Sequence, residues 1–234
     1  MRQYNARASR GEQAAVEYRT LSSELLVDAP VLAVRRDRIT TATGEAVREV
    51  VEHFSAVAIV AVRASAQGGS PEVMLVRQYR RPVDRYLWEL PAGLLDVVGE
   101  TPLDAARREL AEETGLAADQ WHLLGDVCSS PGVSEEMCRI FLAENVRPAT
   151  SEDPGTGEKA VGEEADMTNR WLPVDEAVAW VRDGRIENAT AVAGLLHLHA
   201  GTRRDVSEPF SYRSGLAARR AAGRLSGTDM KHVR

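Results

Sequence analysis

The chain has 234 residues, 44% of them hydrophobic, which is enough to bury the core of one large domain with a small appendage. Its formal net charge of −6 argues against a nucleic-acid-binding protein, because such proteins usually present a basic face. No run approaches the roughly 18 apolar residues that a membrane-spanning helix requires, so we expect no membrane span.

The N-terminus and the cysteines favour a cytoplasmic protein. Residues 1–14 are polar and arginine-rich with no apolar stretch behind them, so we expect a disordered end and no secretory signal. Cys128 and Cys138 lack CxxC spacing and form no disulfide framework, which favours reduced thiols.

Two β-rich stretches follow, at 24–40 and 45–53, and the turn-like sequence TATG separates them. Their alternation of apolar and polar residues predicts a small antiparallel sheet. We therefore expect residues 15–53 to form a small N-terminal β domain.

A larger sheet is predicted after this unit. Residues 54–64 are a nearly continuous apolar run, typical of a buried strand, and we expect them to pair as a hairpin with a strand at 72–80. Further strands are expected at 86–93 (ending at Pro91), 121–129, 136–144 and 170–174, and helices at 175–184 and 188–200. Because strands and helices do not alternate strictly, the pattern indicates a mixed sheet with helices packed on it.

One further helix has clear signals at both ends. Thr101 is suited to the N-cap, Pro102 to the first helical position, and Asp104 completes a capping-box pattern. Gly115 stands where a C-terminal glycine belongs.

This helix carries Glu109, Glu112 and Glu113 together, although like charges at such spacings repel by about 0.3 kcal/mol per pair. One interpretation is an ordinary solvated helix face. The other is a site for a hard cation such as Mg²⁺, which takes carboxylate oxygens together with substrate phosphates. The acidic stripe borders the buried face of the helix, and Arg108 lies four residues before Glu112, where it can hold that side chain.

The surrounding residues favour the cation. Glu100 is followed after seven residues by the sequence RELAEETGL, residues 108–116. This pattern resembles the Nudix box, the signature of the Nudix hydrolases. It departs from the box at one point: six residues, and not five, separate Gly93 from Glu100. The loop therefore carries one extra residue, while the helical part matches completely.

Flanking segments resemble the ADP-ribose pyrophosphatases within that family, over roughly residues 24–200. They are VVEHFSAVAIV, RQYR, ELPAGLLD, SPGVSEE, EEADM and GRIENATAVAGLLHLHA. The resemblance implies an α/β/α sandwich at residues 54–200. It also implies that the N-terminal β domain pairs with a second subunit, giving a homodimer whose active sites draw residues from both chains.

The resemblance also implies a chemistry. Glu109 and Glu113, with Glu112 and the backbone carbonyl of Ala92, would bind Mg²⁺ or Mn²⁺. Water would attack a phosphorus of ADP-ribose, giving AMP and ribose 5-phosphate. Divalent ions suit this reaction because they screen the charge of the pyrophosphate and activate water.

Two arginines and a loop complete the expected site. Arg48 and Arg80 are carried over as phosphate-binding residues, with surface arginines as the alternative. The general base is expected from the polar loop 148–164, with Glu164 the first choice and Glu163 the second. The alternative is that these loop acids serve only for solvation.

Three other functions remain open. The chain could hydrolyse another nucleotide sugar or a dinucleotide, since close relatives share several of these segments. It could be a non-catalytic, nucleotide-binding regulatory module, although such a module would be expected to have lost box glutamates. Finally, the basic C-terminal tail, residues 201–234, could contact nucleic acid, but we expect it to be solvated or partly helical.

Overall fold

The computed structural model describes residues 18–65, 68–156 and 166–230, and these residues form two sheets. The smaller sheet is antiparallel and contains, in order, β1 (Thr20–Asp28), β2 (Leu32–Thr41) and β3 (Gly44–His53). The β-rich stretch 24–40 is thus divided between two strands. The division falls around Pro30, which has no N–H to donate to a ladder. The expected disordered end, residues 1–14, lies outside the described residues.

The larger sheet has seven strands and is mixed, as the sequence predicts. Its main path runs β10 (Thr168–Pro173), β5 (Glu72–Arg80), β4 (Ala56–Arg63), β9 (Met137–Pro148) and β8 (Leu116–Cys128). Strands β4 and β9 are parallel, and the other neighbours are antiparallel. The predicted strand 86–93 is in fact two strands, because the chain changes partner at Leu90 and Pro91. After the 3-10 turn η1 (Arg81–Val83), β6 (Arg85–Glu89) pairs with β5, whereas β7 (Ala92–Leu94) pairs with β4.

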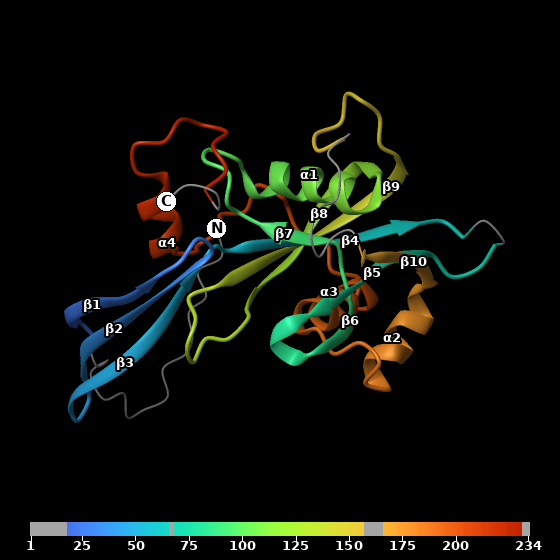
Figure 1. The fold of residues 1–234 in the computed structure, drawn as a ribbon. Coiled ribbons are helices and arrows are strands. Elements are labelled where there is room, and N and C mark those ends of the chain that lie inside the picture. The colour runs from blue at the N-terminus through green and yellow to red at the C-terminus, as the bar shows by residue number, and fades with distance from the viewer. Residues whose placement is uncertain (1–17, 66–67, 157–165, 231–234) are drawn as a thin grey trace.

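Helices cover both faces of this sheet (Figure 1). Helix α1 (Pro102–Thr114) lies on one face, and α2 (Val174–Arg182) and α3 (Ala189–His199) lie on the other. Strand β4 faces both layers, so its residues are buried on both sides, which explains its continuous apolar sequence. The resulting α/β/α sandwich is the predicted fold class. Among the described residues, no helix combines the length and apolar character needed to span a bilayer.

Helix α1 begins and ends where its sequence predicts. The Thr101 hydroxyl accepts a hydrogen bond from the backbone N–H of Asp104 at 3.2 Å, and Pro102 opens the helix. Gly115 closes it in the left-handed conformation, at φ 67°, which glycine adopts without a Cβ clash. The ends of the acidic helix are therefore fixed by local interactions.

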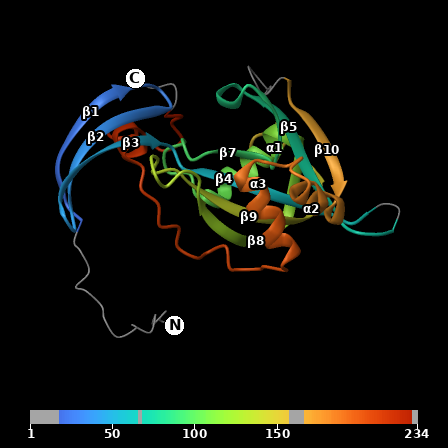
Figure 2. The same cartoon turned by 90° about the horizontal axis from the view of Figure 1, so that it is seen from below.

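The chain after α3 is packed against the fold over its described part, up to Met230. A strap of residues 201–214 pairs with β8 through two hydrogen bonds between Leu123 and Arg204. It leads to α4 (Gly215–Ala221), which lies against the three-stranded sheet (Figure 2). Leu216 and Met230 are buried there in one cluster with Ala33 and Phe54.

Ion pairs hold α4 in place. Arg219 pairs with Glu52, a β3 carboxylate that also binds Arg35. Burial alone would raise the pKa of Glu52, but the two arginines outweigh it and hold the pKa below its ordinary value. Arg220 binds Asp28 and donates to the carbonyl oxygen of Ala29 at 2.9 Å. The tail, expected to be solvated or partly helical, contains the helix α4, and two of its basic residues are structural.

Packing of α1 predicts a measurable loss of stability. Leu110 is 0% exposed, so we expect Leu110→Ala to lower the free energy of unfolding by about 2–5 kcal/mol through lost burial and a residual cavity. Leu225 is 83% exposed, and Leu225→Ala should change it by less than about 0.5 kcal/mol. Urea unfolding followed by circular dichroism measures both. Equal losses would contradict the assigned core.

Candidate active site

The acidic end of α1 is organised by one arginine. Arg108 donates from Nε and Nη2 to the two carboxylate oxygens of Glu100, at 2.9 and 3.0 Å. Its Nη1 donates to Glu109 at 2.7 Å and to Glu112 at 3.0 Å, the second contact being the one that its i, i+4 spacing predicts. Burial opposes the charge of Arg108, but these carboxylates raise its pKa above the ordinary value. One permanent cation therefore holds three carboxylates.

Strand β7 lies directly against these glutamates. The backbone N–H of Ala92 donates to Glu113 Oε2 at 2.9 Å. At Gly93, an added Cβ would lie 1.9 Å from the Glu109 carboxylate carbon, so any larger residue would displace that carboxylate. Glu109 itself is buried, at 7% exposure. The strand and the helix thus form one unit, in which the backbone of β7 contacts the carboxylates of α1.

These donors fit a hard divalent cation. In the described part of the chain, no three or more His, Cys, Asp or Glu side chains already form a metal-binding group. Mg²⁺ commonly needs only one or two protein carboxylates, because substrate phosphates and water complete its octahedron. Glu109 and Glu113 both reach the backbone of β7, and every donor is an oxygen. The arrangement therefore suits Mg²⁺ or Mn²⁺ rather than a thiolate-preferring or imidazole-preferring metal.

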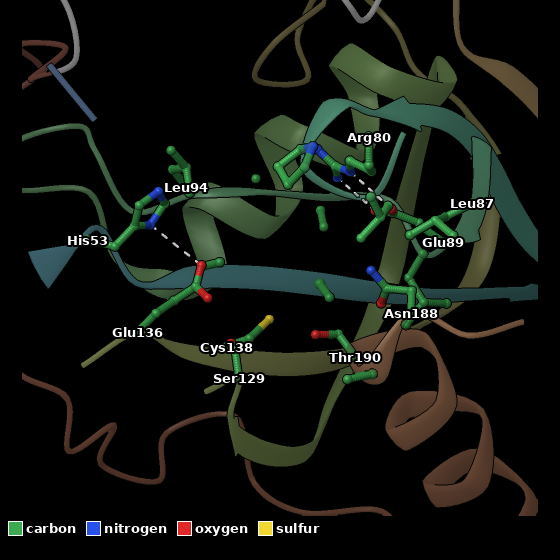
Figure 3. A pocket seen from close by; sticks show the side chains of 18 of the residues that line it. His53, Arg80, Leu87, Glu89, Leu94, Ser129, Glu136, Cys138, Asn188 and Thr190 are labelled. Atoms are coloured by element: carbon green, nitrogen blue, oxygen red, sulfur yellow. Dashed lines mark hydrogen bonds and ion pairs between the residues drawn. The ribbon is translucent and has the colours of Figure 1, made fainter. Parts of the chain in front are cut away.

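A cavity of about 710 Å³ opens on the other side of β7 (Figure 3). Ala92 and Gly93 line it, so β7 borders both the cavity and the glutamates. The polar side chains that line it come from several elements and are His53, Arg80, Glu89, Ser129, Glu136, Asn188 and Thr190. A cavity of this size, mainly apolar with a few polar side chains, suits a small-molecule ligand.

The structure separates the two predicted phosphate-binding arginines. Arg80 lines the cavity, and its guanidinium binds the buried carboxylate of Glu89 through two hydrogen bonds of 2.9 and 2.7 Å (Figure 3). Arg48 lies on β3, is exposed, and donates to the carbonyl oxygen of Val47 at 2.8 Å. Within one chain, therefore, Arg80 belongs to the cavity and Arg48 does not.

The sequence did not single out several cavity residues. His53 Nδ1 lies 3.5 Å from Glu136, and this pair faces Arg80 and Glu89 across the cavity (Figure 3). Both residues fall in segments whose resemblance to the ADP-ribose pyrophosphatases is visible, VVEHFSAVAIV and SPGVSEE. The sequence of these segments indicated that they belong to the site. Which of their side chains face the cavity, however, depends on the fold.

Glu163 and Glu164, the predicted bases, lie outside the described residues, but both flanks of their loop contact α1. On one flank, a Cβ at Gly155 would lie 2.6 Å from the Arg108 carbonyl oxygen and 2.9 Å from Glu112 Cγ. On the other flank, the Asn169 side chain donates to the Glu113 carbonyl oxygen at 2.9 Å. Described residues on both sides of 157–165 therefore contact the glutamate helix.

Comparison with known proteins agrees with this geometry. Residues 52–193 match the model of the NUDIX domain, a span that includes β7, α1 and every cavity-lining residue except Val31. The chain belongs to the Nudix hydrolase family. It is 48% identical to an ADP-ribose pyrophosphatase of Mycobacterium tuberculosis over 187 residues, which cover 80% of this chain and 85% of that protein.

Two more similarities extend over most of this Nudix hydrolase. A methanol dehydrogenase activator of Bacillus methanolicus is 29% identical over 185 residues, covering 78% of this chain and 92% of that protein. A crystal structure of an ADP compounds hydrolase is similar in fold, with a TM-score of 0.65 at 20% identity. It covers 81% of this chain and 96% of the other, which supports the fold.

The longer loop of this Nudix box leaves its helical part intact. The six residues between Gly93 and Glu100 end in a turn, where Glu100 N–H donates to the Val97 carbonyl at 3.2 Å and Gly99 has φ 81°. Glu100 still reaches Arg108 with both carboxylate oxygens. The extra residue is therefore accommodated in the loop itself.

The contact between Gly93 and Glu109 predicts that Gly93→Ala impairs the Nudix site. The added methyl must displace the Glu109 carboxylate, and a displacement of about 1 Å can cost on the order of 100-fold in rate. We expect a loss of that size in nucleoside diphosphate hydrolysis, measured as initial rates. Gly132→Ala is a control, since no atom lies within 4 Å of its added Cβ. Full activity in Gly93→Ala would refute the assigned contact.

The two cysteines should differ in reactivity. Burial, reinforced by the Glu136 carboxylate, raises the pKa of Cys138 to about 12, so this thiol stays protonated at pH 8. Cys128 is exposed. We expect iodoacetamide at pH 8 to alkylate Cys128 and to leave Cys138 unmodified, as measured by peptide mass spectrometry. In urea both should react, and equal rates in the native protein would contradict the assigned burial.

Proposed function

We propose that this Nudix hydrolase cleaves the pyrophosphate of ADP-ribose to AMP and ribose 5-phosphate. The main support is its 48% identity to the M. tuberculosis ADP-ribose pyrophosphatase over 85% of that protein. The cavity supports the same substrate class. It measures about 710 Å³, combines a mainly apolar lining with polar side chains such as Arg80 and Asn188, and shares the wall Ala92–Leu94 with the carboxylates of α1.

The metal would be held by Glu109 and Glu113, with Glu112 and the carbonyl of Ala92. When bound, Mg²⁺ or Mn²⁺ screens phosphate charge and lowers the pKa of a bound water. Mg²⁺ is our first choice, because the donor set is made of oxygens. Arg108 keeps Glu109 and Glu112 turned toward each other before any ion arrives, since one guanidinium nitrogen binds both.

Two other groups act on substrate and water in this proposal. The guanidinium of Arg80, fixed by Glu89, binds a phosphate or a ribose oxygen from the cavity side. Glu164, or Glu163 as the second choice, accepts the proton of the attacking water. The contacts of Gly155 and Asn169 with α1 support this role, because these residues, one before and one after positions 163 and 164, lie beside the glutamate helix.

A homodimer accounts for the three-stranded sheet. Every residue of β1 is exposed, and β1 is an edge strand. The exposed apolar side chains of this sheet are Leu21, Leu25, Leu26, Val27 and Val47. Exposed apolar edges of this kind are usually covered by a partner. In our proposal a second copy covers them, and Arg48 reaches the cavity of that copy.

We also propose the domain division that the sequence predicts. Residues 15–53 form the dimerising β domain, 54–200 the hydrolase domain and 201–234 a C-terminal extension. The start of the NUDIX match at residue 52 supports the first boundary. Two free cysteines support a cytoplasmic location.

The similarity to a methanol dehydrogenase activator favours one alternative, a regulatory role. The complete set of box glutamates argues for catalysis, because a module that only binds a nucleotide has no need of them. Hydrolysis of another nucleotide sugar or of a dinucleotide would use the same residues.

The test is incubation of the protein with ADP-ribose and Mg²⁺, with products resolved by chromatography. We expect AMP and ribose 5-phosphate, and a loss on the order of 100-fold or more in Glu113→Gln, which removes a metal-binding oxygen. Glu176→Gln, an exposed α2 glutamate, is the matched control. Intact ADP-ribose after incubation with the wild type would refute this substrate, and a panel of other nucleotide sugars and dinucleotides would follow.

A further inference from the structure

The C-terminal arm, defined as residues 226–230, pairs with the box loop, residues 94–99. The Val98 N–H donates to the Thr228 carbonyl at 3.0 Å, and the Gly227 N–H donates to the Val98 carbonyl at 2.6 Å. The Met230 N–H donates to the Asp96 carbonyl at 2.7 Å. The arm lies outside the residues that match the NUDIX domain, yet it pairs with the loop that carries the extra residue.

Side chains fit the arm closely to this loop. The Ser226 hydroxyl donates to the Val98 carbonyl at 3.2 Å. A Cβ at Gly99 would lie 2.5 Å from that hydroxyl oxygen, and the backbone there, at φ 81°, is in the left-handed region that favours glycine. At the other end of the arm, Met230 is buried with Leu216 in the cluster under α4. The arm is thus held at both ends while its backbone binds the loop.

Both ends of the box loop contact the carboxylate cluster. Before the loop, Gly93 packs against the Glu109 carboxylate. After it, Glu100 binds Arg108, which in turn binds Glu109 and Glu112. A loop with an additional residue has additional backbone groups that need hydrogen-bond partners. The arm supplies those partners at Asp96 and Val98, midway between the two contacts with the cluster.

We propose that residues 226–230 position the metal-binding glutamates. By fixing the middle of the box loop, the arm sets Gly93 and Glu100, and through them the arrangement of Glu109 and Glu112. This inference rests on the proposed role of these glutamates as metal ligands. A purely structural arm would instead stabilise the fold and leave the affinity for the ion unchanged.

The experiment compares ion binding in chains of different length, without substrate. One variant ends at Ser226 and loses the hydrogen bonds of Gly227, Thr228 and Met230 with the loop. A matched control ends at Met230 and keeps all of them. Free Mn²⁺ is titrated by electron paramagnetic resonance. We expect the Mn²⁺ Kd to rise about tenfold in the shorter variant and to stay unchanged in the control. A tenfold change is the smallest effect that is typical when a residue that orients metal ligands is lost.

A second pair of variants separates this effect from loss of folding. Met230→Pro removes the N–H that binds Asp96, whereas Met230→Leu keeps both this N–H and an apolar side chain. We expect weaker Mn²⁺ binding in the first and wild-type binding in the second, with cooperative thermal unfolding in both. If the chain ending at Ser226 does not fold, the comparison of Met230→Pro with Met230→Leu tests the positioning role.

The outcomes distinguish this inference from the proposed function. Unchanged Mn²⁺ affinity in folded Met230→Pro would overturn the positioning role, even if the wild type hydrolyses ADP-ribose. Weaker Mn²⁺ binding in the variants, together with no hydrolysis of ADP-ribose by the wild type, would support the positioning role and refute the substrate. Absence of Mn²⁺ binding by the wild type without substrate would overturn the positioning role, whereas the hydrolysis assay tests the proposed function separately.

Discussion

The structure around the glutamates depends on the guanidinium of Arg108. Three carboxylates from one helix and the preceding loop would repel each other if they converged without a cation, and repulsion strengthens as water is excluded. Arg108 bridges Glu100 to Glu109 and Glu112, so it joins the loop before α1 to the acidic end of the helix. The planar fork of arginine makes this possible, because a lysine ammonium has no comparable bidentate geometry.

The rest of the sandwich places this cluster beside a cavity. Strand β4 is buried on both faces and holds β7 along one edge, while α1 packs on the layer above. As a result, a single strand, β7, lies between α1 and the cavity, and the backbone of Ala92 and Gly93 borders both. A ligand on one side and an ion on the other would then be within reach of the same short segment.

The sequence best predicted the features that depend on residues close together in the chain. The ends of α1 follow from Thr101 and Gly115, and the contact from Arg108 to Glu112 follows from helical spacing. It predicted less well what depends on distant segments. His53 and Glu136 meet only after β3 and the loop before β9 come together, and the arginines of α4 looked solvated until Glu52 and Asp28 were placed beside them. Arg48 is a different case, since its proposed role needs a second chain.

The buried cluster of Ala33, Phe54, Leu216 and Met230 has a consequence for the order of folding. It joins residues from the two ends of the described chain, so closing it requires ordering a very long intervening segment, and contacts of such sequence separation form late. During synthesis, Ala33 and Phe54 therefore stay exposed to solvent until Met230 has left the ribosome. The strands of the hydrolase sheet all lie before residue 174, so this sheet can assemble earlier, and the N-terminal unit is completed only after residues 216–230 have been made.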